Sequence, residues 1–137
     1  MWWIYALLSA LFAAVTAIFA KVGVKDVNSD VAMAIRTVVI LFIAWGIVFA
    51  RGEAGEVSGL TKTNIMFLCF SGIATGLSWI FYFKALQLGN VSQVAPIDKL
   101  SVALVLIFSV IFLKEPLTIK TFIGGVLIIA GTIFMIN

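Results

Sequence analysis

The sequence predicts an all-α membrane protein, a bundle of five transmembrane helices. Three observations carry this prediction. Hydrophobic residues make up 64% of the 137 residues, and charged residues make up 11%, against roughly 25% in soluble domains. The mean hydropathy is +1.24. A water-soluble chain this short is mostly surface and could not bury so much apolar area, so a soluble or disordered chain is excluded.

Five apolar stretches are each close to the length of about 20 residues that crosses a bilayer core. They cover approximately residues 2–20, 31–50, 65–86, 91–113 and 117–136. Together they form one predicted transmembrane domain over residues 1–137. Gly89 and Asn90 separate the third span from the fourth. Pro116 suits the first turn of a helix and marks the start of the fifth.

Several classes of function are excluded by what the sequence lacks. There is no histidine, and Cys69 is the one cysteine, so neither a metal site nor a bound cofactor is expected. No nucleophile–base set or buried pair of carboxylates supports an enzyme. No basic stripe or aromatic platform supports nucleic-acid binding.

Positive charge gives only a weak preference for one orientation. An odd number of spans puts the termini on opposite sides. One side collects four cations (Arg51, Lys62, Lys114 and Lys120). The other collects three (Lys21, Lys25 and Lys84), or five when Arg36 and Lys99 extend toward it. Because the bias of lysine and arginine sets orientation, either dual insertion or an orientation fixed by other features is open.

Three charges lie deep in the predicted spans: Arg36, Asp98 and Lys99. Each costs on the order of 2.5–3.5 kcal/mol at the centre of a bilayer. They either form a binding or proton-coupling site, or they form ion pairs that only orient helices. Neighbours on a helix point about 100° apart, so Asp98 and Lys99 are not expected to pair with each other. We expect Asp98 to pair with Arg36 and Lys99 to stay free for a solute.

Pro96 removes a backbone hydrogen bond two residues before Asp98. Non-helical backbone at membrane depth is tolerated where it meets protein or a water-filled cavity, and broken helices serve transporters in binding and gating. Pro96 is therefore a candidate gating kink, with a static kink as the alternative. Trp79 either stacks on an organic solute or packs against lipid or protein.

Small residues on three spans favour close helix packing. The glycines expected at such contacts are Gly72, Gly76, Gly124, Gly125 and Gly131.

Across nearly the whole chain, and most strongly in its second half, the order of features resembles the EamA-type proteins of the drug/metabolite transporter superfamily. The resemblance rests on the A-L-x-x-G turn at 85–89, V-A-P-I at 94–97, Glu115 within K-E-P-L-T, and the glycine-bearing helix at 124–131. Typical members carry two five-helix repeats, whereas this chain carries one. The resemblance implies one half of a ten-helix inverted-repeat transporter, completed by forming a homodimer, possibly antiparallel.

The function that follows is secondary transport of a small organic metabolite or drug-like solute by alternating access. The alternative is a non-transporting membrane subunit that stabilises or regulates a partner. The expected partners are the lipid bilayer, a small-molecule solute and a second copy of the chain. The expected location is a prokaryotic inner or plasma membrane.

Overall fold

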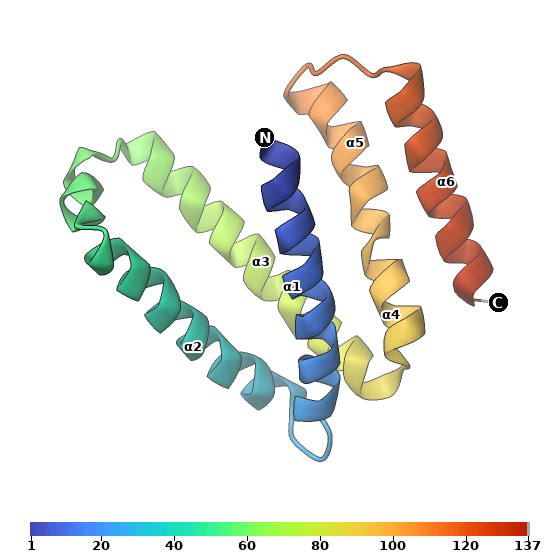
Figure 1. The fold of residues 1–137 in the computed structure, drawn as a ribbon, viewed down its shortest axis with the longest axis horizontal. Coiled ribbons are helices and arrows are strands. Elements are labelled where there is room, and N and C mark those ends of the chain that lie inside the picture. Colours follow the sequence, from blue (N-terminus) through green and yellow to red (C-terminus); the bar gives the residue numbers. More distant parts are fainter. Residues whose placement is uncertain (137) are drawn as a thin grey trace. The chain divides into compact units, whose positions relative to one another are not determined.

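The computed structural model describes residues 1–136, and within them every regular element is a helix (Figure 1). The elements are α1 (Trp2–Gly23), α2 (Ser29–Ala50), the 3-10 helix η1 (Glu53–Gly59), α3 (Lys62–Leu88), α4 (Val91–Asp98), α5 (Leu100–Phe112) and α6 (Ile119–Ile136). Five segments of this described part are long and apolar enough to cross a membrane, with α4 and α5 forming one of them. The predicted fold class is thus confirmed.

Large apolar side chains are exposed along every span. Phe134 is 85% exposed, Trp2 79% and Phe42 73%. In water such a surface would be strongly unfavourable, whereas lipid tails solvate it without cost. The exposed surface therefore indicates that the helices are in contact with lipid.

The chain forms two compact units, residues 19–87 and residues 1–18 with 88 onward. In the first unit, η1 reverses the chain so that α3 runs antiparallel to α2 (Figure 1). Asn28 caps α2, since its side-chain oxygen accepts hydrogen bonds from the backbone N–H groups of Asp30 (2.8 Å) and Val31 (3.4 Å). Such a cap satisfies N–H groups that have no partner inside the helix.

The last turn of α1 and the loop before α2 are each hydrogen-bonded to the last turn of α3. Lys21 Nζ donates a hydrogen bond to the carbonyl of Leu86, and Gln87 Nε2 donates one to the carbonyl of Val27 at 2.8 Å. Val24, Phe83 and Leu86 are each at most 2% exposed. The start of α2 and the end of α3 are therefore held at the same end of this unit.

In the second unit, α6 packs against both α4 and α5. Pro116 lies in the irregular connection between α5 and α6, three residues before α6 begins, so the expectation that it starts the last helix is wrong. Thr118 caps the helix instead, because its hydroxyl accepts a hydrogen bond from the N–H of Thr121 at 3.1 Å.

Only one of the five predicted packing glycines closely approaches another element. A Cβ added to Gly125 would lie 2.9 Å from Cδ1 of Leu106 on α5. Within residues 1–136, the other four have nothing within 4 Å of the same position; they are Gly72, Gly76, Gly124 and Gly131.

Candidate functional site

The fourth span is interrupted near its middle, between α4 and α5. Pro96 lies inside α4 and has no N–H to donate to the preceding turn. Two residues later the helix ends, and Lys99 lies outside both helices. The N–H of Lys99 donates to the carbonyls of Pro96 (3.0 Å) and Ala95 (3.3 Å). The expected discontinuity is therefore present, and it coincides with the charged residues.

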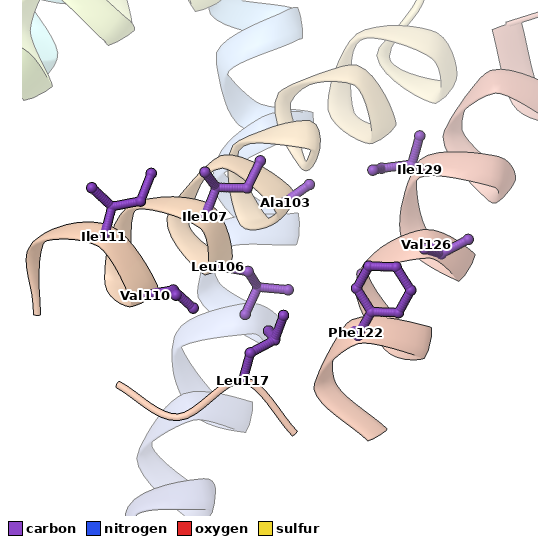
Figure 2. Close-up of a pocket in the computed structure, with 10 residues that line it drawn as sticks. Ala103, Leu106, Ile107, Val110, Ile111, Leu117, Phe122, Val126 and Ile129 are labelled. Atoms are coloured by element: carbon purple, nitrogen blue, oxygen red, sulfur yellow. The ribbon is translucent and has the colours of Figure 1, made fainter. Parts of the chain in front are cut away.

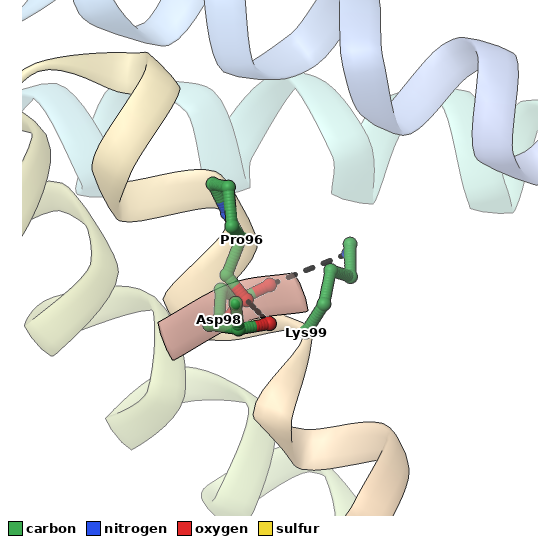
Figure 3. A network of polar contacts seen from close by, with 4 residues as sticks. Pro96, Asp98 and Lys99 are labelled. Carbon is green, nitrogen blue, oxygen red and sulfur yellow. Dashed lines mark hydrogen bonds and ion pairs between the residues drawn. The ribbon is translucent and has the colours of Figure 1, made fainter. Parts of the chain in front are cut away.

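Asp98 and Lys99 form an ion pair, with Lys99 Nζ 3.4 Å from Asp98 Oδ2 (Figure 3). The expectation that they could not pair is wrong. It assumed a continuous helix, whereas Lys99 has ψ near −9°, far from the helical value of about −42°. The Asp98 side chain is 37% exposed and that of Lys99 58%. The pair thus neutralises two deep charges locally and remains accessible.

Thr132, on the neighbouring helix α6, contacts the interrupted part of the fourth span. It is 5% exposed, and its hydroxyl lies 2.8 Å from the carbonyl of Ile128 and 3.3 Å from that of Pro96. The Pro96 carbonyl already accepts a hydrogen bond from the N–H of Lys99 at 3.0 Å, so the Thr132 hydroxyl is a second donor beside it. Thr132 is not among the site residues predicted from the sequence. The signal available was a hydroxyl directly after Gly131 in an otherwise apolar span.

Arg36 on α2 lies against aromatic rings of α3. Its guanidinium carbon is 4.2 Å from the centroid of the Trp79 ring and 5.5 Å from that of Phe83. Both distances fall in the range of cation–π attraction, about 6 Å. Trp79 and Phe83 are four residues apart and share one face of the helix. The structure therefore brings together two of the predicted site residues, Arg36 and Trp79.

Arg36 has no acidic partner in its own unit. No carboxylate of residues 19–87 forms an ion pair with it. Asp98 belongs to the other unit, so the pairing of Arg36 with Asp98 stays a prediction.

An apolar pocket of about 300 Å³ lies between α5 and α6 (Figure 2). Leu106, Ile107 and Val110 line it from α5, and Phe122, Val126 and Ile129 from α6. It offers room for an apolar group and no hydrogen-bonding side chain. Among residues 1–136, no three side chains of the metal-binding types gather into a cluster.

The chain belongs to the EamA-like transporter family, whose model matches residues 1–137. It is 50% identical over 134 residues to a Sinorhizobium protein named an uncharacterized transporter in the cobO 3′ region, covering 98% of this chain and 95% of that protein. It is 32% identical over 77 residues to an uncharacterized protein of Methanocaldococcus jannaschii, covering 56% of each. No solved structure matches the chain. This membership points to a non-enzymatic integral membrane transporter.

Proposed function

We propose that this protein is a secondary transporter that moves a small organic metabolite or drug-like solute by alternating access. The observation that carries the proposal is the break at Lys99, where an ion pair lies inside an otherwise apolar span. Membership of a transporter family supports it. Each unpaired charge at this depth costs on the order of 2.5–3.5 kcal/mol, so charges that can separate at a break favour a functional site over a purely structural helix.

The break supplies a place where the span bends. Helix α4 ends at Asp98 and α5 starts at Leu100, so a change in the backbone of Lys99 reorients one segment against the other. Asp98 and Lys99 would separate to bind solute or a coupling ion and close again when the site is empty. Pro96 keeps the break in place, because it prevents a continuous hydrogen-bonded helix.

A homodimer, with its two copies parallel or antiparallel, would complete the transport pathway. One five-span repeat gives half of an inverted-repeat arrangement, in which solute sites lie at the repeat interface. The near balance of cations on the two sides permits insertion in both orientations. The open surfaces at Gly72 and Gly76 leave room for a helix of a second copy. In this arrangement residues 1–137 act as one transmembrane domain in a prokaryotic plasma membrane.

The test is solute release from sealed vesicles. Purified protein is reconstituted into vesicles loaded with a defined mixture of organic acids, amines and nucleosides, and release is followed by mass spectrometry. We expect wild-type protein to release at least one compound faster than protein-free vesicles. Asp98→Asn and Lys99→Gln should each reduce that release at least tenfold.

Asp30→Asn and Lys62→Gln are matched controls, because they remove charges from the first turn of α2 and from the first residue of α3. They should release solute at the wild-type rate. Wild-type rates in both Asp98→Asn and Lys99→Gln would contradict the assigned site. No release by wild-type protein would contradict transport and favour the regulatory subunit.

A further inference from the structure

Arg36 is a deep cation whose guanidinium contacts aromatic rings. Asp98 and Lys99 already neutralise each other. The carboxylates of residues 19–87 form no ion pair with Arg36. Its guanidinium, which has five N–H donors and no acceptor, instead lies against Trp79 and Phe83. Aromatic rings offer no conventional hydrogen-bond acceptor, and the guanidinium is only part-buried, so its N–H groups remain accessible to an anion.

Arg36 lies far enough along α2 for its guanidinium to be inside the membrane. The start of α2 and the end of α3 lie at one end of their unit, joined by the hydrogen bond from Gln87 to Val27. Arg36 is seven residues from the start of α2, and Trp79 is nine residues from the end of α3. At about 1.5 Å per residue, these are depths of roughly 10 Å and 13 Å.

This depth separates the site from lipid headgroups. An arginine that reaches a headgroup extends its stem along its own helix toward the interface. Here the guanidinium is held 4.2 Å from the ring of a residue on the neighbouring helix, and Phe83 beside it is 2% exposed.

We propose that Arg36 binds the carboxylate or phosphate group of the transported solute, so that the solute is an organic anion. This rests on the proposed function and adds the substrate class. Trp79 and Phe83 hold the guanidinium in place, and its N–H groups donate to the anion. Hydrogen bonds between guanidinium and carboxylate are charge-assisted and are often paired, and they strengthen in a medium of low dielectric. Lys99 is neutralised by Asp98 when the site is empty, so Arg36 is the cation that selects the solute.

Trp79 fluorescence reports this binding without any transport step. A protein in which Trp2, Trp3 and Trp45 are replaced by Phe leaves Trp79 as the one indole. In nanodiscs of neutral lipid, benzoate and inorganic phosphate are the two anionic probes, and tetraethylammonium is the cationic control. We expect at least one anion to change Trp79 emission saturably and tetraethylammonium to leave it unchanged.

Matched variants assign the signal to one charge. Arg36→Gln should weaken anion binding at least tenfold, which corresponds to about 1.4 kcal/mol, and Arg36→Lys should recover part of it. Arg51→Gln removes the same charge at the end of α2 and should leave binding unchanged. A protein that keeps Trp45 as its one indole should show no response, since Trp45 pairs with Phe49 away from Arg36 along α2.

Three outcomes of the binding experiment would overturn the proposal. The first is no response of Trp79 to either anion. The second is a response only when the nanodiscs contain anionic lipid, which would identify a headgroup site. The third is a change in Trp79 emission on Asp98→Asn without added anion, which would show that Asp98 is the partner of Arg36. Saturable binding without solute release would contradict only the transport proposal, whereas release of amines alone would contradict only the anion site.

Discussion

Thr132 shows how a single hydroxyl can stabilise an interrupted span. It is buried on α6 and reaches the carbonyl of Pro96 on α4. Hydrogen bonds between membrane helices contribute about 0.6 kcal/mol on average. The contact is therefore small in energy but lies at the point where α4 is about to end.

Replacing Thr132 with valine keeps the volume and removes this hydrogen bond. We expect the free energy of unfolding in mixed micelles to fall by about 0.5–1.5 kcal/mol, and Thr132→Ser to restore most of it. Thr75→Val is the control, since the Thr75 hydroxyl donates only to Ser71 on its own helix. Equal losses in Thr132→Val and Thr75→Val would contradict a role for Thr132 at the break.

Asp98 and Lys99 should be energetically coupled. In a double-mutant cycle with Asp98→Asn and Lys99→Gln, each single variant leaves one deep charge unpaired, whereas the double variant leaves none. We expect a coupling free energy of about 1 kcal/mol or more, measured by unfolding. The cycle of Asp98→Asn with Lys114→Gln, at the far end of α5, should show none. A coupling near zero between Asp98 and Lys99 would mean that their contact does not persist in lipid.

The chemistry of the site residues was easier to predict than their partners. Charges in apolar spans made Arg36, Asp98 and Lys99 visible in the sequence. Their contacts depended on two facts that residue spacing does not contain: the helix ends at Asp98, and α2 faces Trp79 of α3. The contact of Thr132 with Pro96 joins residues 36 positions apart, so local pattern gave no indication of it.

At the scale of elements, hydropathy located the spans well and their ends less well. All five predicted spans are present, and the break at Gly89 and Asn90 lies between α3 and α4. The polar loop before α3 contains η1, which the glycine-rich sequence did not indicate. The start of α6 was predicted wrongly because proline is common both in a first helical turn and in an extended connection. The helix begins after Thr118, whose hydroxyl caps it.

The contact between α5 and α6 should be sensitive to volume at Gly125. Gly125→Val places side-chain atoms against Cδ1 of Leu106; because this is the end of a flexible side chain, we expect a cost of about 1 kcal/mol, the low end for overpacking. We expect Gly124→Val, one residue earlier with open space around it, to cost less. Adding Leu106→Ala to Gly125→Val should recover stability, as measured by thermal unfolding in detergent. Equal costs at Gly124 and Gly125 would contradict the close approach.

At the scale of the whole molecule, five crossings are predicted to place the two termini on opposite sides of the membrane. Cysteines introduced at residues 2 and 137, in a Cys69→Ser background, are labelled with a reagent that does not cross membranes. In a population of one orientation we expect one terminus to react in intact vesicles and the other only after permeabilisation. Reaction of both termini in intact vesicles would contradict the five-span topology.

The charge balance makes orientation itself adjustable. Three lysines added to the connection at 51–62 should direct the chain into one orientation. If the working form is an antiparallel dimer, solute release should fall as the population becomes uniform. Full release from a uniformly oriented population would contradict the antiparallel arrangement and leave a parallel dimer.

The most direct test of alternating access is the accessibility of the break from each side of the membrane. Ile97→Cys, beside Asp98 and with Cys69 replaced by Ser, is labelled from outside sealed vesicles with a membrane-impermeant maleimide. Protease then cleaves a C-terminal tag only in molecules whose C-terminus faces outward, which separates the two orientations. The account predicts labelling in both groups. Labelling in one group alone, or in neither, would contradict it.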